Sequence, residues 1–337
     1  MTATYIIAEA GVNHNGKLET AIELVNEAKK CGADCAKFQT FKAEQLVTDT
    51  SPKAKYQTLV TDAAESQFQM LKSLELSFDD FKTLKDHCEK IGIDFLSTPY
   101  NKEDADLLDA LGVFGFKIAS GQLTELPFLE YVASKRKTMI ISTGMANMAE
   151  VFAAVETIRS IGNNDIVVLQ CTTNYPSRIE DANILAMNSI KEACKVRVGY
   201  SDHVPNNYAC YAAVALGAEM IEKHFTLDKT MAGPDHSSSL DTAEFKELVE
   251  GVRNIEKSLG DGIKRPSEIE IENSFGMKRS IVLLRDLEKG QILSEKDLGF
   301  KRPANGMGPN FITQVIGKKL VRSMTKDEPL NFDSIEW

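Results

Sequence analysis

The stretches Val198-Gly-Tyr-Ser-Asp-His-Val and Met220-Ile-Glu-Lys-His-Phe-Thr are two short apolar runs, and each ends in a polar cluster. Each cluster contains one histidine, His203 or His224, although the whole chain has only five. If both runs are strands of one parallel sheet, their carboxyl ends share an edge and both imidazoles project from it. The pair is therefore a candidate divalent-metal site, with two unrelated strand-end histidines as the alternative.

Segments of the same kind recur through the first 260 residues, where apolar runs of strand character alternate with segments of helical periodicity. The expected strands cover residues 5–10, 36–41, 94–99, 115–120, 138–144, 165–171, 197–201 and 219–225. The expected helices cover residues 17–31, 78–91, 102–111, 125–136, 147–161, 183–194, 207–216 and 242–259. Eight strand–helix units in about 255 residues fit a closed (β/α)8 TIM barrel better than an open doubly wound sheet. The first strand is not followed by Gly-x-Gly-x-x-Gly, which argues against a dinucleotide site.

The composition and pattern of the sequence change after Gly260, and this change indicates a second domain. The next segment is polar, and from Arg279 onward short β segments alternate with turn signals. The predicted organisation is a barrel over residues 1–260, a linker over residues 261–278 and a small β-rich domain over residues 279–337.

The chain of 337 residues has a net charge of -10 and no basic run. Nucleic acid and anionic membrane surfaces are therefore poor partners. The six cysteines stand mostly in apolar surroundings and are expected to be reduced and buried. No apolar run in the sequence approaches the roughly 20 residues that span a bilayer. The amino terminus begins almost at once with a strand-like pattern and has no basic segment of the kind that opens a signal peptide. A cytoplasmic protein is the resulting expectation.

Side chains at the carboxyl ends of barrel strands meet at one mouth. Lys37 and Lys117 each stand in an apolar strand, and a buried ammonium needs a partner. With hydroxyls from several strand ends they would form a cradle for phosphate and carboxylate groups, unless each belongs to a structural ion pair. Further polar residues expected at this mouth are Glu9, Gln39, Thr98, Ser120, Gln122, Ser142, Thr173, Tyr175, Ser201, Asp202, Glu222 and, from a loop, Asp235.

The expected metal site around His203 and His224 has no cysteine beside it and only oxygen ligands left to add. That donor set favours Mn²⁺ over structural zinc, with Mg²⁺ or Co²⁺ as alternatives. Asp202 and Glu222 are expected to orient the rings or bound water. An ion with open positions would polarise a substrate carbonyl. Two other histidines, at positions 14 and 236, belong to loops at the same mouth, either in the site or on the surface.

Nine short motifs, in order along nearly the whole chain, resemble those of the bacterial sialic acid synthases. The motifs are Ala8–Gly16, Lys37–Thr40, Leu96–Pro99, Phe116–Gly121, Ile141–Met145, Tyr200–His203, Glu222–Thr226, Gly233–His236 and Lys301–Gly306. Members of that family condense phosphoenolpyruvate with an N-acylated mannosamine-type sugar. The resemblance implies a TIM barrel followed by an antifreeze-like (SAF) domain, in a homodimer where this domain reaches the partner's active site.

The resemblance also implies a role for each matching residue. The metal ligands would be His203 and His224. The phosphoenolpyruvate contacts would be Lys37, Thr98, Lys117, Ser120, Ser142 and Ser201. The sugar contacts would be Gln39, Tyr175, Asp235 and, from the other subunit, Arg302. Glu9 matches an active-site carboxylate beside the reacting centre, so the catalytic group comprises Glu9, Lys37, Lys117, His203 and His224. Phosphate is expected to leave by C–O bond cleavage.

Two positions depart from the family pattern. Gln122 stands where the family often has Glu, and Thr173 where it often has Asn. Both are expected to line the pocket, so the sugar stays open. N-acetylmannosamine would give N-acetylneuraminate, and 2,4-diacetamido-2,4,6-trideoxymannose would give legionaminate. As an amide, Gln122 favours an acylamino group over a hydroxyl at carbon 4 of the sugar.

Two other functions fit the same residues. One is another metal-dependent barrel aldolase that acts on a ketone donor and releases no phosphate. The other is a non-catalytic protein that binds carbohydrate.

The excursion over residues 42–76 is too long for an ordinary βα loop. We expect it to be a lid or a dimer element, with an ordinary surface excursion as the alternative.

Overall fold

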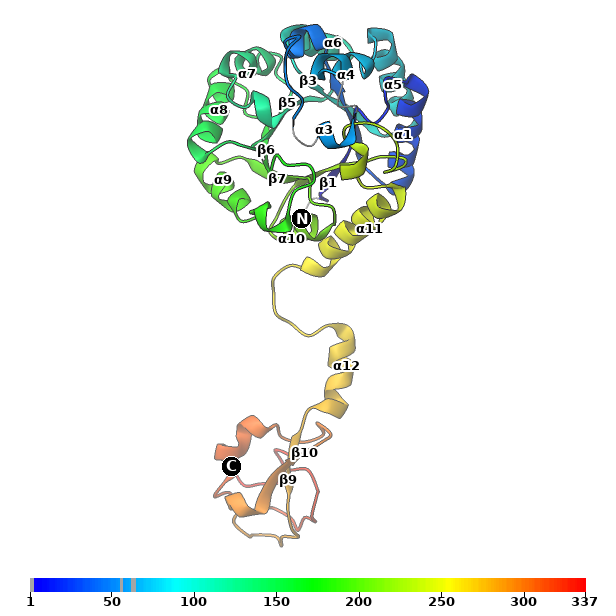
Figure 1. The fold of residues 1–337 in the computed structure, drawn as a ribbon. Coiled ribbons are helices and arrows are strands. Elements are labelled where there is room, and N and C mark those ends of the chain that lie inside the picture. Colours follow the sequence, from blue (N-terminus) through cyan, green and yellow to red (C-terminus); the bar gives the residue numbers. More distant parts are fainter. Residues whose placement is uncertain (1–2, 55–56, 62–64) are drawn as a thin grey trace. The chain divides into compact units, whose positions relative to one another are not determined.

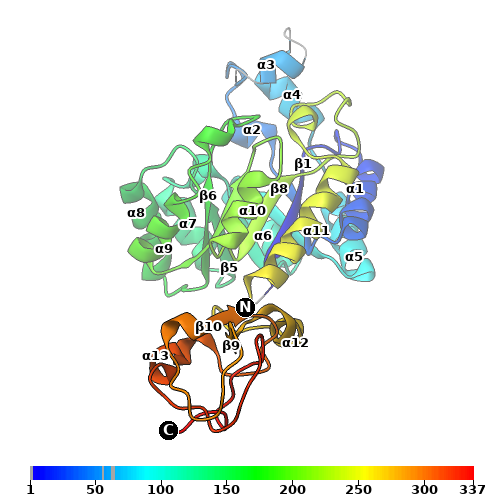
Figure 2. The same ribbon diagram turned by 90° about the horizontal axis from the view of Figure 1, so that it is seen from below.

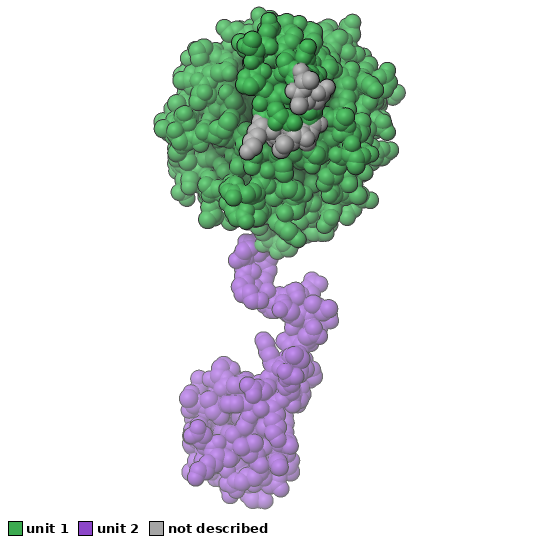
Figure 3. Space-filling view, viewed as in Figure 1, with its two compact units in different colours: residues 1–260 green, residues 261–337 purple. Residues whose placement is uncertain are grey.

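The computed structural model describes residues 3–54, 57–61 and 65–337. The chain forms two compact units, Met1–Gly260 and Asp261–Trp337 (Figure 3). Among the described residues, every helix is too short or too polar to cross a membrane.

Eight parallel strands form a ring in the first unit (Figure 1). They are β1 (Tyr5–Gly11), β2 (Cys35–Thr40), β3 (Asp94–Pro99), β4 (Gly115–Ile118), β5 (Thr138–Ser142), β6 (Ile166–Cys171), β7 (Arg197–Asp202) and β8 (Met220–His224). Hydrogen bonding follows the order β3-β2-β1-β8-β7-β6-β5-β4, and each of these pairs is parallel. The end strands β3 and β4 lie next to each other, so the barrel is nearly closed. The predicted (β/α)8 fold is confirmed.

The helices that connect the strands cover the outside of the ring (Figure 1). They are α1 (Leu18–Cys31), α5 (Phe78–Ile91), α6 (Lys102–Ala110), α7 (Leu126–Ala133), α8 (Met148–Ser160), α9 (Ala186–Cys194), α10 (Tyr208–Ala215) and α11 (Thr242–Leu259). Capping boxes at Ser77, Asn147 and Asp241 begin α5, α8 and α11. Helix α9 begins later than the sequence predicts, because Asn183 has a left-handed φ of 44° that a helix cannot contain.

Apolar side chains fill two layers of the barrel. The residues Ile7, Cys35, Leu96, Ile140, Val167, Leu169 and Met220 pack inside the ring. A larger cluster packs between the strands and the surrounding helices, and it includes Ile6, Phe38 and Phe116. The strands therefore bury side chains on both faces, as parallel barrel strands do, and only their carboxyl ends are free to carry polar groups into a site.

The long excursion after β2 contains α2 (Ala43–Leu46), α3 (Gln57–Val60) and α4 (Gln67–Ser73). These three short helices gather at one end of the barrel (Figure 2). Helix α4 begins in a capping box, in which the Ser66 hydroxyl accepts a hydrogen bond from the Gln69 N–H. The excursion therefore contains short helices joined by irregular segments.

The second unit has its own apolar core. Strands β9 (Ser280–Leu283) and β10 (Leu298–Lys301) pair antiparallel. Helix α13 (Ile312–Val315) adds Val315 to a core that contains Ile281, Leu283, Leu287, Leu293, Leu298, Met307, Leu320, Met324, Leu330 and Ile335. The segment predicted to be a linker contains helix α12 (Glu268–Met277), whose residues are all at least partly exposed.

Candidate active site

A pocket of about 580 Å³ lies at the carboxyl ends of the barrel strands. It brings together most of the residues that the sequence predicts at this mouth: Glu9, Lys37, Gln39, Thr98, Lys117, Ser120, Gln122, Ser142, Thr173, Tyr175, Ser201, His203, Glu222, His224 and Asp235. The predicted residue Asp202 is outside the lining, and Arg302 follows β10 in the second unit. Its predicted contact with a sugar in the other subunit stays a prediction.

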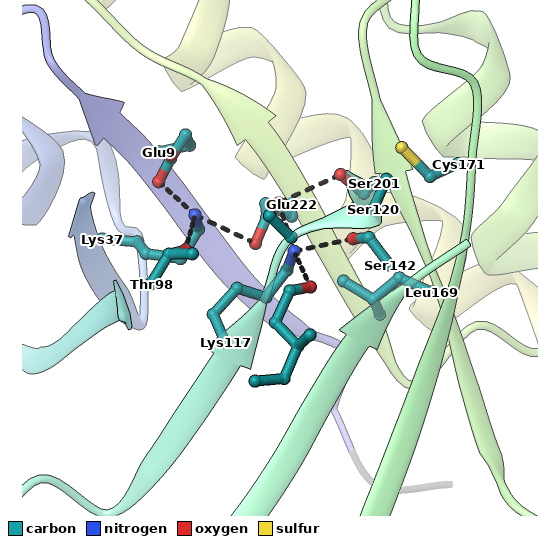
Figure 4. Close-up of polar contacts among 12 residues, drawn as sticks. Glu9, Lys37, Thr98, Lys117, Ser120, Ser142, Leu169, Cys171, Ser201 and Glu222 are labelled. Atoms are coloured by element: carbon teal, nitrogen blue, oxygen red, sulfur yellow. Dashed lines mark hydrogen bonds and ion pairs between the residues drawn. The ribbon is translucent and has the colours of Figure 1, made fainter. Parts of the chain in front are cut away.

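Lys37 comes from the middle of β2 and is buried at the base of the pocket (Figure 4). Its Nζ atom lies 2.7 Å from Glu9 Oε2 and 3.7 Å from Glu222 Oε2, and it donates to Thr98 Oγ1 at 3.3 Å. Burial raises the pKa of the Glu9 carboxyl to about 7, although Lys37 opposes the shift. Glu9 can therefore exchange a proton near neutral pH.

Lys117 projects from β4 toward the same carboxylate (Figure 4). Its Nζ atom lies 3.5 Å from Glu222 Oε1 and donates to Ser142 Oγ at 2.7 Å and to Ile118 O at 3.2 Å. Ser201 donates to Glu222 Oε1 at 3.0 Å. Burial alone would raise the pKa of Glu222, but the Lys117 and Lys37 ammoniums hold it below its ordinary value. Glu222 is thus a carboxylate shared by two ammoniums.

The rings of His203 and His224 lie side by side, with centroids 5.3 Å apart. His203 Nδ1 lies 2.7 Å from Thr172 O, so this nitrogen carries a proton and Nε2 is the nitrogen left for an ion. Burial and the charge of His203 hold the pKa of His224 well below its ordinary value. The buried His224 Nδ1 has no hydrogen-bond partner within the described part of the chain. These donors suit a divalent ion, provided that other ligands complete its shell.

Three expectations about the surroundings of these rings need revision. Cys171 lines the pocket, with its Sγ atom 3.9 Å from His203 Nδ1, so a cysteine does stand at the site. Glu222 contacts the two lysines, and Asp202 pairs with Lys223 at 2.5 Å, rather than orienting a histidine ring. A backbone carbonyl holds the His203 ring instead, and sequence patterns do not reveal such a contact.

The two loop histidines are buried side chains outside the lining of this pocket. His236 Nδ1 lies 2.7 Å from Thr226 Oγ1, and His14 Nδ1 accepts a hydrogen bond from the Gly16 N–H at 3.0 Å. Both rings tie a loop to its neighbours, so neither is the surface histidine that one alternative proposed.

The predicted sugar contacts form a second polar group at the pocket. Gln39 donates to Glu9 Oε1 at 3.2 Å, and its own carbonyl oxygen accepts from the Tyr100 hydroxyl at 3.3 Å. Burial raises the pKa of Asp235 to about 6. The Tyr175 ring lies 4.1 Å from the His203 ring, centroid to centroid. Tyr100 was missed from the sequence, although it directly follows a strand end and so obeys the rule that identified the others.

The two departures from the family pattern have different surroundings. Gln122 Nε2 donates to Pro99 O at 3.2 Å, and its Oε1 accepts from the Ala119 N–H at 3.4 Å. A glutamate here would have no donor for the Pro99 carbonyl, so the amide links the ends of β3 and β4. By contrast, the Thr173 hydroxyl is buried with no hydrogen-bond partner in the described residues, and is free for a ligand.

Comparison with known proteins places these residues in a family. Residues 24–264 match the NeuB family, and residues 278–336 match the SAF domain. The chain is 46% identical over 330 residues to the N,N'-diacetyllegionaminic acid synthase of Campylobacter jejuni, covering 97% of this chain and 99% of the relative. It is 44% identical over 336 residues to the enzyme of the same name from Legionella pneumophila, covering 98% and 94%.

A solved structure agrees with these sequence matches. An N-acetylneuraminic acid (sialic acid) synthetase from Leptospira borgpetersenii aligns with a TM-score of 0.72 and 32% identity. The alignment covers 81% of this chain and 90% of that one. This chain belongs to the NeuB family and carries an SAF domain after its barrel.

Proposed function

We propose that this chain is a sialic acid (nonulosonate) synthase that condenses phosphoenolpyruvate, water and an N-acylmannosamine-type sugar. The sugar is N-acetylmannosamine or 2,4-diacetamido-2,4,6-trideoxymannose, and the products are phosphate and N-acetylneuraminate or legionaminate. One observation carries the proposal: two buried lysines share Glu222 among hydroxyls, beside two histidines, at the mouth of the barrel. The similarity to relatives named N,N'-diacetyllegionaminic acid synthases supports the same reaction.

Lys37 and Lys117 would bind the phosphate and carboxylate of phosphoenolpyruvate, helped by the hydroxyls of Thr98, Ser120, Ser142 and Ser201. Ser120 already accepts a hydrogen bond from the Gly144 N–H at 3.0 Å, which leaves its own proton to donate. Without substrate, Glu9 and Glu222 balance the two ammoniums. Because the pKa of Glu9 is about 7, this carboxylate can take up a proton as the donor arrives and leave excess positive charge for it.

His203 and His224 fit a divalent ion by their chemistry, and we propose Mn²⁺, with Mg²⁺ or Co²⁺ as substitutes. Within the described residues, clusters of three or more histidine, cysteine and acidic side chains suited to an ion are absent. Substrate or water oxygens would therefore complete the shell. When bound, such an ion supplies Lewis-acid polarisation of the sugar aldehyde oxygen.

The bond changes balance as follows. The methylene carbon of phosphoenolpyruvate bonds to the aldehyde carbon of the open-chain sugar, and the aldehyde oxygen becomes a hydroxyl by taking the proton that Glu9 gained as the donor arrived. Water adds to the cationic carbon 2 that results, and Glu9, again a carboxylate, would accept one proton of that water. The bond between carbon 2 and the bridging oxygen then breaks, phosphate leaves with that oxygen, and the hydroxyl on carbon 2 gives its proton to the phosphate as carbon 2 becomes a ketone.

We also propose a cytoplasmic homodimer. All six cysteines are buried and none forms a disulfide, which suits a reducing compartment. Helix α12 exposes Ile269, Ile271, Phe275 and Met277 on more than one side, and several exposed apolar side chains on one short helix favour burial against another part of the assembly. In such a dimer Arg302 would reach the other protomer's pocket, where its planar fork suits an acyl oxygen.

Phosphoenolpyruvate labelled with oxygen-18 at the bridging position tests the reaction. The label is expected in the released phosphate, with phosphate formed only when sugar is present. A label retained in the sugar acid would refute C–O cleavage. Condensation of a ketone donor without phosphate release would instead favour an aldolase, and sugar binding without turnover would favour a binding protein.

A further inference from the structure

We infer that the excursion after β2 builds an apolar wall that makes the pocket select amino sugars rich in methyl groups over sugars rich in hydroxyls. The inference rests on the proposed function and narrows its sugar. The apolar wall consists of Leu46, Val47, Met70, Leu71 and Leu74 from the excursion together with Val12, which follows β1, and all six line the pocket.

The apolar wall shares the pocket with the polar base. Lys37, Lys117 and the strand-end hydroxyls come from the barrel strands or their carboxyl ends, whereas all wall residues but Val12 come from the excursion. Val12, Met70 and Leu74 pack with Phe41 in a buried cluster. Leu46, Val47 and Leu71 are only half-buried, so these three leave apolar surface for a ligand.

The wall is held in place by specific contacts. Glu75 accepts a hydrogen bond from the Ala43 N–H at 2.8 Å and lies 3.1 Å from Lys42 Nζ, which ties the start of α2 to the end of α4. Gly16 has a φ of 70°, and a Cβ there would lie 2.3 Å from Ser73 O. Only glycine lets α4 approach the β1 loop so closely. The excursion is therefore packed against the loop after β1, and these contacts hold its apolar wall at the pocket.

Apolar side chains discriminate between the two candidate sugars. A hydroxyl placed against them loses hydrogen bonds to water, whereas a methyl group gains by leaving water. The diacetamido-trideoxy sugar has methyl groups at carbon 6 and on both acetamido groups, while N-acetylmannosamine has hydroxyls at carbons 4 and 6. One methyl-sized difference in an apolar site changes kcat/KM by about 10–200-fold. The wall therefore favours the diacetamido-trideoxy sugar.

Phosphate release with each sugar tests the inference, and the measured quantity is the ratio of their kcat/KM values. The wild type should prefer the diacetamido-trideoxy sugar by at least about 10-fold. Leu71→Asn and the near-isosteric Val47→Thr should each lower that ratio several-fold by raising KM for the preferred sugar, with KM for phosphoenolpyruvate unchanged. Leu185→Asn, at a residue that is 66% exposed and outside the pocket lining, should leave the ratio unchanged.

The outcomes separate this inference from the function on which it rests. Phosphate release with both sugars, but a preference for N-acetylmannosamine or a ratio unmoved in folded Leu71→Asn and Val47→Thr variants, would overturn the role of the wall alone. Failure of the wild type to release phosphate with either sugar would overturn the synthase proposal and this inference with it. Melting temperatures of the variants show that each is folded.

Discussion

The barrel buries lysines of two kinds. Lys37 and Lys117 are each 3% exposed and line the pocket, whereas Lys223 is 1% exposed and is not among the lining residues. Lys223 stands on β8 between Glu222 and His224, which do line it. Because side chains alternate along a strand, Lys223 points to the opposite face. Neighbouring positions on one strand thus serve a ligand site and the surrounding scaffold.

The partners of these lysines differ in kind. Lys223 Nζ contacts Asp202 Oδ2 at 2.5 Å, Asn206 O at 3.0 Å and the main-chain oxygen of Val204. Asp202 is itself held, because its Oδ1 accepts from the Val204 N–H and the Tyr200 hydroxyl, both at 2.9 Å. Every partner of Lys223 is therefore fixed within the protein, and the network secures the loop that follows His203.

The pocket lysines have partners that a ligand can replace. Both share Glu222 at separations of 3.7 and 3.5 Å, which are long for an ion pair, and both contact hydroxyls that line the pocket. Lys37 also pairs at 2.7 Å with Glu9, which lines the pocket too. A phosphate oxygen accepts from an ammonium as these oxygens do, so it could replace such contacts. Burial and charge are therefore the same for both kinds of lysine, and the difference is whether their partners line the pocket.

Lys117→Met should produce the largest effect on activity. Methionine fills the space but removes the charge that we propose binds the donor, so kcat/KM for phosphoenolpyruvate should fall by about 10³-fold, roughly 4 kcal/mol. Stability should change little, because Glu222 keeps Lys37 as a partner. Phosphate release and urea unfolding measure the two quantities. Lys246→Met, on the exposed face of α11, is the control. Near-normal activity of Lys117→Met would contradict the distinction between the pocket lysines and Lys223.

Lys223→Met should lower stability, whereas Lys117→Met should lower activity. Lys223→Met leaves the Asp202 carboxylate buried without its cation, which costs about 3–5 kcal/mol of unfolding free energy. Urea unfolding measures the loss. The double variant Lys223→Met with Asp202→Asn should recover part of it, because the unpaired charge is gone. A double variant no more stable than the single one would mean that the lost ion pair is not the cause.

Much of the site could be predicted from sequence because it follows one geometric rule. Residues such as Lys117 and His203 stand at the carboxyl ends of apolar strands, and a barrel brings those ends together. The rule does not predict the apolar wall, because Leu71 belongs to a helix of seven residues whose position depends on tertiary contacts. Nor does it reveal that Gln122 links two strands, because both of its partners are main-chain groups.

His224→Ala tests the pocket side of β8 one position beyond Lys223. Removal of one of two imidazoles should weaken Mn²⁺ binding by more than about 100-fold, beyond the effect of losing a residue that only supports a ligand. Unfolding free energy should fall far less than in Lys223→Met, because His224 Nδ1 has no partner among the described residues to lose. Calorimetric titration with Mn²⁺ measures the first effect. Unaltered Mn²⁺ affinity would remove His224 from the proposed metal site.

Ser142→Ala should give the smallest of these effects. It removes the hydroxyl that lies 2.7 Å from Lys117 Nζ, but Lys117 keeps Ile118 O and Glu222. Loss of one hydrogen bond to a charged group costs at least about 1.5 kcal/mol, and Lys117 keeps its other partners, so kcat/KM for phosphoenolpyruvate should fall by roughly 10-fold. The exposed Ser160→Ala, which loses only a bond to Thr157 O, is the matched control. If Ser142→Ala lowered stability and left kcat/KM intact, the partners of Lys117 would be structural, and the distinction from Lys223 would fail.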